Sequence, residues 1–406
     1  MRKTVYFLLL IGGLLVSACQ STTTRTSDDP KSDVAGKDYF PHKAQVNYAR
    51  HFTVSYHGNY KIVRTNSTLR DWGTNDQSPI EDVVVLVQRG TEPPSLKGDL
   101  ARAQVIMVPV KKVAVNMEGT ETYLETLDLL PGLVAVGGTK SYNDSVRART
   151  ERGELGQIGY SWFEPPKLEV LLQRKPDIFF MVLSRLSFAG SLDKSRQVGI
   201  ATTPLFDWAE IDYLGRAEWI KYMALFFNEE EKANGLFATV ERNVAELKQK
   251  VKDVPHKPVC AWAEFAAKGF WLCQGNNVEA RLLRDAGATN PFEDFSKPAS
   301  AIGEAYTVEE FLDRALNADY WILSSRPSVE WPPSAYMNGF KAWREDKLLY
   351  NHLRSKPEHN AYDWYGLGQV RPDLILADLI HQLHPDVLPH HKPVFIGNYE
   401  RTTTTK

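Results

Sequence analysis

The chain has 406 residues, of which 43% are hydrophobic, 24% charged and 11% aromatic, and its formal net charge is −2. This composition is typical of a globular protein and argues against a disordered, collagen-like or membrane-embedded chain. Proteins that bind nucleic acid usually carry a clear basic excess, which this chain lacks, so we expect no nucleic-acid partner. The length exceeds what one hydrophobic core usually serves, and it therefore predicts two lobes.

The first 18 residues are predicted to be a lipoprotein signal peptide. Two basic residues precede the apolar run Val5–Leu15, which is too short for a transmembrane helix of about 20 residues. The run ends in Val-Ser-Ala-Cys19, which is similar to the bacterial lipobox, where cleavage before the cysteine exposes it to lipidation. We therefore expect an exported protein on the periplasmic or cell-surface face, anchored in a membrane through lipidated Cys19. The sequence leaves open which membrane this is.

Residues 19–39 contain few large apolar side chains, so they are predicted to form a flexible tether. Residues 40–207 follow as an N-terminal lobe with a β-rich start, in which His51–Ser55 and Asp82–Gln88 are expected strands. Short apolar runs then alternate with helical stretches, and this alternation predicts a parallel sheet with covered faces. The expected strands are Val113–Val115, Val134–Val136 and Ile178–Leu183; the expected helices end near Leu129 and span Leu168–Arg174.

Residues 208–255 are predicted to form a helical hinge between the lobes. Apolar residues recur at spacings of three and four along one long segment, which indicates an amphipathic helix. Asn228 is the expected N-cap, and Pro255 and Pro258 stop the helix. The apolar positions are Ala233, Leu236, Phe237, Val240, Val244, Leu247 and Val251.

Residues 256–391 are predicted to form a C-terminal lobe of the same kind, followed by a tail over residues 392–406. The expected strands are Pro258–Glu264, Gly269–Cys273 and Tyr320–Ser324; the expected helices are Val278–Ala286, Val308–Ala315 and Arg371–Leu383. The fold class is therefore α/β, with two lobes whose largely parallel sheets are flanked by helices and joined by one long rigid helix.

Two cysteines remain after Cys19, and they flank a predicted strand–turn–strand. A hairpin could bring the sulfurs of Cys260 and Cys273 close together, and an exported compartment permits a disulfide. Two buried thiols in a small apolar strand pair are the alternative, and the sequence leaves both open because geometry decides between them.

Several local motifs, in their order and spacing over roughly residues 105–390, resemble the helical-hinge (class III) substrate-binding proteins of ABC importers. These proteins are receptors for ferric siderophores, haem or cobalamin. The motifs are Pro109–Val115, Leu133–Gly138, Leu168-Glu169 through Lys175-Pro176-Asp177-Ile178, Leu214–Trp219, Gly275–Gly287, and Val370-Arg371-Pro372-Asp373 through Leu383-His384-Pro385.

The resemblance implies two lobes that move little about one helix and hold a large ligand between them. It implies a binding protein without catalytic activity or a cofactor of its own, which docks onto the permease of an ABC importer; we expect a monomer. In the family, one surface glutamate on each lobe pairs with permease arginines. Glu169 matches this position in the first lobe and Glu309 in the second, with Glu310 as the alternative.

Ligands of open α/β sheets bind beyond the carboxyl ends of the strands, and the segments that follow the predicted strands are rich in aromatic residues. Flat aromatic side chains pack well on a corrin, porphyrin or catecholate face, and arginines pair with anionic groups, although each single aromatic is more often a core residue. The candidate ligand-binding residues are Tyr142, Tyr160, Trp162, Phe163, Arg185, Arg326, Trp331, Tyr362, Trp364 and Tyr365.

Free metal-ion capture is a neighbouring alternative, but the first predicted strand ends in Asn116-Met117-Glu118 without a histidine, so we expect no direct metal site. We rank a ferric siderophore or another iron complex first as the ligand, cobalamin second and haem third. A chelatase-like enzyme and an envelope interaction module without a small ligand are the alternatives of other classes. The usual hydrolase, nucleotide-binding and metalloprotease motifs are absent from the sequence.

Overall fold

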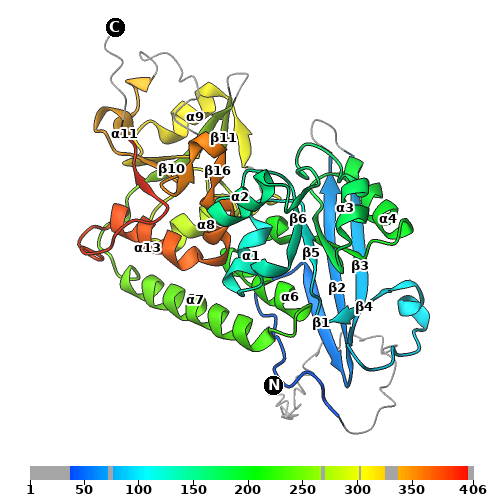
Figure 1. Cartoon of the computed structure of the whole chain (residues 1–406). Coiled ribbons are helices and arrows are strands. Elements are labelled where there is room, and N and C mark those ends of the chain that lie inside the picture. Colours follow the sequence, from blue (N-terminus) through cyan, green and yellow to red (C-terminus); the bar gives the residue numbers. More distant parts are fainter. Residues whose placement is uncertain (1–36, 72–75, 267–269, 301–302, 325–336, 401–406) are drawn as a thin grey trace, which may run out of the picture.

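The computed structural model describes residues 37–71, 76–266, 270–300, 303–324 and 337–400. These residues form two lobes, and helix α7 (Glu230–Lys250) runs along both of them (Figure 1). This helix packs against α6 (Trp219–Leu225) beside the first lobe and against α13 (Pro372–Leu383) of the second lobe. The predicted fold class is thus confirmed. One continuous apolar core extends from the first lobe through these helices into the second lobe, which gives the connection its stiffness.

The central sheet of the N-lobe is entirely parallel, with strand order β7-β6-β5-β8-β9. Its strands are β5 (Val113–Val115), β6 (Leu133–Val136), β7 (Gly156–Gln157), β8 (Ile178–Val182) and β9 (Thr202–Leu205). The helices between them are α1 (Thr120–Thr126), α2 (Asp144–Glu151), α3 (Leu168–Arg174) and α4 (Gly190–Gln197). The strands predicted at Val113, Val134 and Ile178 and the helix at Leu168 are confirmed.

The β-rich start of the N-lobe is a separate four-stranded sheet, in which the strands follow one another in chain order. They are β1 (Phe52–His57), β2 (Tyr60–Arg70), β3 (Gln77–Gln88) and β4 (Gln104–Val108). The ring of Phe52 lies 5.0 Å from that of Trp219 and 5.3 Å from that of Tyr222, so this sheet packs directly on α6. The two predicted strands of this region are confirmed.

The hinge contains α5 (Tyr213–Ala217) and α6 before α7. The predicted apolar face of α7 is confirmed, because Ala233, Phe237, Val240 and Val244 are buried. The predicted N-cap is wrong: Asn228 has a left-handed backbone with φ of 60°, and its side-chain oxygen accepts a hydrogen bond from the Lys61 ammonium at 2.9 Å. That ammonium also forms a buried ion pair with Glu230, which ties β2 to the start of α7.

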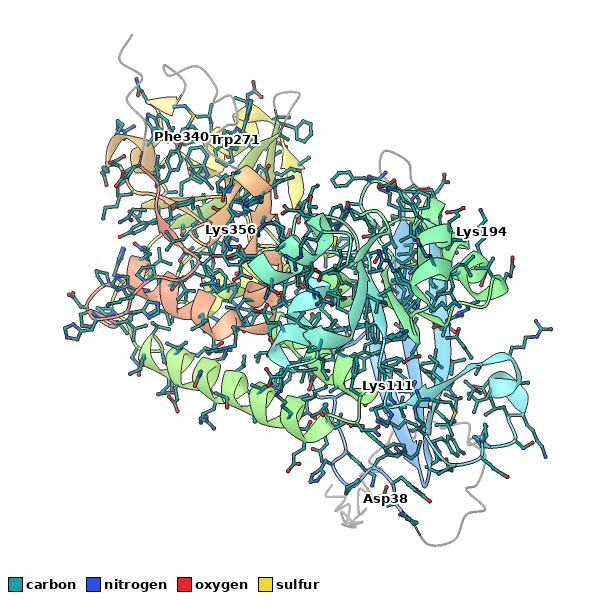
Figure 2. All side chains as sticks on the ribbon, viewed as in Figure 1. Asp38, Lys111, Lys194, Trp271, Phe340 and Lys356 are labelled. Atoms are coloured by element: carbon teal, nitrogen blue, oxygen red, sulfur yellow. The ribbon has the colours of Figure 1, made fainter. Side chains whose placement is uncertain are left out.

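The C-lobe contains a six-stranded sheet that is parallel only at its centre. Its order is β12-β11-β10-β13-β14-β17, and only β10, β13 and β14 run parallel to one another. The strands are β10 (Cys260–Ala266), β11 (Phe270–Cys273), β12 (Glu304–Tyr306), β13 (Tyr320–Leu323), β14 (Leu348–Tyr350) and β17 (Gly397–Asn398). One face of this sheet is covered by an aromatic core that includes Trp271 and Phe340 (Figure 2).

The helices of the C-lobe are α8 (Val278–Asp285), α9 (Val308–Ala315), α11 (Lys341–Arg344), α12 (Leu367–Val370) and α13. A small hairpin, β15 (Ser355–Lys356) with β16 (Ala361–Tyr362), projects toward the N-lobe and lies beside α2 in Figure 1. The helices predicted at Val278, Val308 and Arg371 are confirmed. Within the described ranges, no helix is both long enough and apolar enough to span a membrane.

The sequence predicts a tail over residues 392–406, but the first residues of this segment belong to the C-lobe instead. Phe395 and Ile396 are fully buried, and β17 pairs with β14 at the edge of the C-lobe sheet. The buried carboxylate of Asp378 accepts hydrogen bonds from the backbone N–H groups of Val394, Phe395 and Ile396 at 2.5–3.0 Å. The C-lobe therefore extends at least to residue 398.

The two remaining cysteines are buried free thiols. The predicted hairpin is confirmed, but Cys273 pairs in register with Ala263, three residues along β10 from Cys260. Three residues of strand separate the two positions by roughly 10 Å, which is more than a disulfide spans. Of the two alternatives that the sequence leaves open, the structure therefore shows the thiols. Cys19 lies outside the described residues.

Candidate ligand-binding cleft

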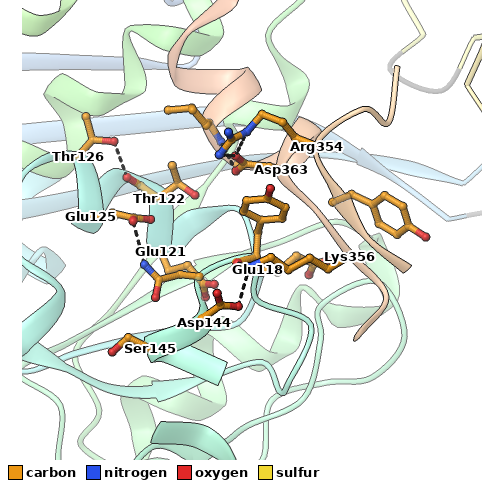
Figure 3. A pocket seen from close by; sticks show the side chains of 15 residues that line it. Glu118, Glu121, Thr122, Glu125, Thr126, Asp144, Ser145, Arg354, Lys356 and Asp363 are labelled. Carbon is orange, nitrogen blue, oxygen red and sulfur yellow. Dashed lines mark hydrogen bonds and ion pairs between the residues drawn. The ribbon is translucent and has the colours of Figure 1, made fainter. Parts of the chain in front are cut away.

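A cleft of about 450 Å³ lies between the two lobes (Figure 3). The N-lobe contributes the segments that follow β5 and β6, and the C-lobe contributes the β15–β16 hairpin and the loop before α12. The residues that line it are Glu118, Glu121, Thr122, Glu125, Thr126, Tyr142, Asn143, Asp144, Ser145, Arg354, Lys356, Tyr362, Asp363, Gly366 and Leu367. The cleft is therefore the place where the two lobes present side chains to each other.

The position of the cleft follows from the topology of the N-lobe sheet. The chain leaves β5 toward β6 and β7 and then returns to the other side of β5 with β8, so the strand order reverses beside β5. A crevice forms beyond the carboxyl ends of the strands at such a point. The buried side chain of Asn116 fixes this end of the sheet, because it accepts a hydrogen bond from the Val182 N–H at 2.8 Å and donates one to the Val182 carbonyl at 3.3 Å.

Three glutamates of the N-lobe form what we call the acidic floor of the cleft: Glu118, Glu121 and Glu125. Glu118 comes just before α1, and the other two lie within it, so their spacing of three and four places them on one side of the helix. Figure 3 shows them gathered on the N-lobe side of the cleft. Glu125 is exposed and accepts a hydrogen bond from the Asn143 side-chain amide at 2.8 Å.

The surroundings of the other two carboxyl groups of the acidic floor disfavour their ionised form. Glu121 is only 3% exposed, and burial raises its pKa to about 8, with the charges of Glu118 and Glu125 adding to the rise and Ser141 opposing it. Burial likewise raises the pKa of Glu118. One carboxyl oxygen of each, Oε2 of Glu118 and Oε1 of Glu121, has no hydrogen-bond donor among the described residues. Within the same ranges, no group of three or more His, Cys, Asp or Glu side chains is arranged to hold a metal ion.

The two basic residues of the cleft come from the C-lobe, and both are already paired. The Arg354 guanidinium lies 2.7 Å from the buried carboxylate of Asp363, within its own lobe. The Lys356 ammonium crosses to the N-lobe, where it lies 2.6 Å from the Asp144 carboxylate and 2.9 Å from the Tyr142 carbonyl oxygen. Figure 2 labels Lys356 at this boundary. We call Lys356, Asp144 and Tyr142 the inter-lobe bridge.

Two of the aromatic residues predicted to bind the ligand, Tyr142 and Tyr362, line the cleft. The Tyr142 ring centroid lies 4.5 Å from the Lys356 ammonium and 5.0 Å from the Arg354 guanidinium carbon, so the ring already packs against cations. The Tyr362 ring packs edge-on against His352 at 4.8 Å. The cleft is thus mixed in character, with carboxyl groups outnumbering the aromatic rings. An aromatic cleft, as expected from the sequence, is not what the structure shows.

Tyr362, Trp364 and Tyr365 separate because a short 3-10 helix, Asp363–Tyr365, carries the chain through a turn. Trp364 is buried and packs against Trp262 at 5.7 Å, so it belongs to the core of the C-lobe rather than to the lining of the cleft. Tyr365 is 43% exposed and does not line the cleft with its side chain. Asp363, between them, is buried and holds Arg354 in place.

The remaining candidates of the N-lobe also lie away from the cleft lining. Tyr160 packs over Gly137 and Gly138, and its hydroxyl accepts a hydrogen bond from the Lys140 N–H at 2.7 Å. Trp162 packs against Trp208 at 6.4 Å, whereas Phe163 is 69% exposed. Arg185 is half-buried, with its guanidinium 5.7 Å from the Phe188 ring. Arg326 and Trp331 lie outside the described residues.

The two glutamates expected to face a permease occupy equivalent places on the two lobes. Glu169 lies in the first turn of α3 and Glu309 in the first turn of α9, and both are exposed. The neighbouring Glu310 is engaged in a capping box with Thr307, in which each side chain accepts a hydrogen bond from the other residue's backbone N–H. Glu310 therefore has a role within its own helix, whereas Glu309 is the freer carboxylate of the pair.

Sequence reasoning missed the charged residues of the cleft, namely Glu118, Glu121, Glu125, Asp144, Arg354 and Lys356. A usable signal existed for the glutamates. They follow directly on the first predicted strand, at positions where a parallel sheet places its ligand, and their spacing puts them on one face of the next helix. The two basic residues have no such local signal, because their place opposite the N-lobe depends on how the lobes assemble.

A two-lobed α/β structure with a rigid connecting helix and a cleft between its lobes defines a solute-binding protein. The family model for periplasmic binding proteins matches residues 119–356, which is more than half of the chain, so the chain belongs to this family. The matched segment contains ten of the fifteen residues that line the cleft. Proteins of this family bind substrates for ABC transport of iron, haem and other metal chelates, and they are not enzymes.

The chain is also similar to two uncharacterized lipoproteins of Methanocaldococcus jannaschii. One is 26% identical over 317 residues, covering 74% of this chain and 72% of the relative. The other is 24% identical over 325 residues, covering 75% and 76%. Together with the family, these relatives indicate an exported protein.

Solved structures show the same fold at low sequence identity. A crystal structure of Helicobacter pylori CeuE in a Ni-His complex matches with a TM-score of 0.52 and 13% identity, over 80% of this chain and 90% of that one. The periplasmic heme-binding protein RhuT from Roseiflexus sp. RS-1, in apo form, matches with a TM-score of 0.50 and 15% identity, over 68% and 99%. These matches establish the arrangement of lobes and helix.

Proposed function

We propose that this chain is the lipid-anchored substrate-binding protein of an ABC importer, which captures a metal chelate between its lobes and delivers it to the permease. The observation that carries the proposal is the cleft at the carboxyl ends of β5 and β6, to which both lobes contribute charged and aromatic side chains. Its volume falls within the range of small-molecule sites in proteins. An iron complex is the ligand that we place first, with cobalamin and haem as the alternatives within the same class.

The relatives and structural neighbours support the lipid anchor and the class of ligand. Both relatives from Methanocaldococcus jannaschii are lipoproteins, in agreement with a lipid on Cys19 and with an exported protein. Among the structural neighbours, one binds heme and another was solved in a Ni-His complex. A transported metal complex is therefore the ligand class that agrees with both the family and the fold.

The contacts between the lobes suggest how a ligand is held and released. The Lys356–Asp144 ion pair joins the lobes, but Asp144 is 73% exposed, so the pair contributes little free energy and can open at small cost. Helix α7 and the continuous core limit how far the two lobes move relative to each other while the cleft opens. We infer that a chelate enters between the β15–β16 hairpin and α1 and is held by side chains from both.

Docking to the permease is assigned to Glu169 and Glu309. Each is an exposed carboxylate at the start of a helix on its own lobe, where it is available to an arginine of a partner. Because one glutamate lies on each lobe, a permease that contacts both would sense the relative position of the lobes.

Intrinsic fluorescence provides the first test. The chain contains ten tryptophans, so a bound chromophoric chelate should quench a large part of the emission. Purified mature protein is titrated with a ferric siderophore, cobalamin and haem, and the proposal predicts saturable quenching by at least one of them. Absence of saturable quenching with all three would overturn the proposed function.

A further inference from the structure

The charges in the cleft do not balance. Both cations that line it are paired, Arg354 with Asp363 and Lys356 with Asp144. None of the three carboxyl groups of the acidic floor forms an ion pair with a described residue. Both cations that line the cleft are thus neutralised within the protein, while the acidic floor holds carboxyl groups whose ionised form a cationic ligand would favour. An anionic chelate would need the opposite arrangement.

The interior of the cleft also has unused hydrogen-bond capacity. Glu121 is almost fully buried, with 3% exposure, and its Oε1 has no hydrogen-bond donor among the described residues. The same holds for Oε2 of Glu118. A buried carboxyl oxygen without a donor raises the free energy of the folded protein. A ligand that brings N–H donors to this place would remove that cost, so the burial itself favours a donor-bearing ligand.

We propose that Glu118 and Glu121 form a subsite for a cationic nitrogen group, such as a protonated amine, carried by the transported chelate. The inference rests on the proposed function and narrows it to a class of chelate. A carboxylate pair accepts charge-assisted hydrogen bonds from an ammonium group, and these are stronger than bonds between neutral groups. A trianionic catecholate complex would instead meet like charges at the acidic floor.

The surroundings of the subsite agree with this assignment. The exposed Glu125 adds a third carboxylate on α1, and the Tyr142 ring nearby already accepts two cations on its faces. Two residues of the segments packed against α1 oppose the rise in these pKa values. The charge of Lys140 lowers the pKa of Glu118, and a hydrogen bond from the Ser141 side chain lowers the pKa of Glu121. The Lys140 ammonium itself packs over the Tyr160 ring, 4.9 Å from its centroid.

A matched pair of chelates isolates the cationic group. Ferrioxamine B is a neutral iron–trihydroxamate core with a terminal ammonium group, and its N-acetyl derivative has the same core without that charge. Isothermal titration of the mature protein with both, and with an anionic ferric tricatecholate complex, measures the preference. We expect ferrioxamine B to bind about tenfold or more tightly than its acetylated form, because a hydrogen bond to a charged group is lost on acetylation.

Variants locate the preference in the cleft. E118Q and E121Q remove the ionisable carboxyl group and keep the shape, and each should reduce the preference for the ammonium form by about tenfold. E151Q is the matched control, because it makes the same charge change at an exposed position at the end of α2, outside the cleft lining. E151Q should leave the preference unchanged. Circular dichroism and thermal unfolding verify that each variant is folded.

Hexaamminecobalt(III), a compact cation covered with N–H groups, separates this inference from the proposed function. If chelates bind but show no preference for the ammonium group, the cationic subsite is overturned and the proposed function stands. The same conclusion follows if the preference is present and survives in E118Q and E121Q. If no chelate binds but hexaamminecobalt(III) does, and E118Q and E121Q weaken it, then the subsite stands and the proposed function falls. If neither kind of probe binds, both are overturned.

Discussion

Gly119 of the N-lobe lies directly against the backbone of Tyr365 in the C-lobe: a Cβ atom at Gly119 would be 1.9 Å from the Tyr365 carbonyl oxygen. A second glycine completes the contact from the other side, since a Cβ atom at Gly366 would be 2.6 Å from the Thr122 hydroxyl. Only residues without a side chain permit the lobes to come this close. The contact lies beside the acidic floor, so the spacing of the lobes at the cleft depends on it.

We therefore predict that Gly119→Ala forces the lobes apart at the cleft. The added methyl group meets backbone atoms, which cannot rotate away, so the lobes must shift. We expect about a tenfold loss of chelate affinity, or 1.4 kcal/mol, with a larger radius of gyration by small-angle X-ray scattering. Gly235→Ala in α7 is the matched control, because a Cβ atom there meets nothing within 4 Å. An unchanged affinity in the Gly119 variant would show that the contact does not set the cleft.

A second prediction concerns Glu218, which holds residues 47–49 on the hinge. Its carboxylate is fully buried and accepts hydrogen bonds from the backbone N–H groups of Asn47, Tyr48 and Ala49 at 2.7–3.1 Å, as well as from the Lys221 ammonium at 2.8 Å. Glu218→Gln replaces one acceptor by a donor that faces other donors. We expect the free energy of unfolding to fall by about 3 kcal/mol or more in chemical denaturation.

The control for this variant is Glu246→Gln, which makes the same change at an exposed position of α7. An exposed substitution of this kind should alter the free energy of unfolding by no more than about 0.5 kcal/mol. Equal stability of the two variants would mean that the buried carboxylate does not secure residues 47–49.

The third prediction is a pH dependence of stability that originates in Glu121. Burial in the folded protein raises the pKa of this carboxyl group to about 8 from its ordinary value of 4.5, so between these pH values the folded chain holds a proton that the unfolded chain has released. The contribution of Glu121 to stability is therefore fully present below pH 4.5 and is lost as the pH rises through 8. The loss is at most about 1.4 kcal/mol for each pH unit.

Denaturant titrations of the wild-type protein and of Glu121→Gln between pH 5 and pH 8 measure this effect as a difference. We expect the wild-type protein to lose stability relative to the variant as the pH rises. A difference that is constant with pH would contradict the burial of an ionisable carboxyl group at this position. In the same range, binding of a cation to the cleft should strengthen with pH, because it requires the ionised carboxylate.

The fourth prediction separates binding from delivery. Glu169→Arg reverses a charge on the exposed first turn of α3, outside the cleft lining. We expect unchanged chelate affinity in vitro and loss of uptake in cells, because a permease arginine would then face a like charge. Glu164→Arg reverses an exposed charge shortly before the same helix and serves as the control. Normal uptake with Glu169→Arg would remove the docking assignment.

Much of the fold could be predicted because its signals are local. Helix α9 has its capping box at Thr307 and Glu310, α7 has a repeating apolar face, and Asp177 follows a proline immediately before a buried strand. The carboxylate of Asp177 accepts hydrogen bonds from the N–H groups of Lys111 and Lys112, and these bonds place β8 beside β5. Elements specified by neighbouring residues appear in the sequence as patterns.

The lining of the cleft could not be predicted in the same way. Tyr362 and Trp364 are two residues apart, yet one faces the cleft and the other the core, because the turn at Asp363 directs them differently. The strand β17 depends on the distant carboxylate of Asp378, and the pairing of Lys356 with Asp144 spans more than 200 residues. Such relationships arise from tertiary assembly, which composition and periodicity do not record.

Capture of a metal chelate in the cleft between the lobes can be measured as metal that the protein retains after dialysis. Mature protein is mixed with each chelate, dialysed to equilibrium, and analysed for metal per chain. We expect close to one metal complex per chain for at least one chelate with wild-type protein and with Gly235→Ala, and markedly less with Gly119→Ala. No retained metal with any chelate, or equal retention in the Gly119 variant, would contradict it.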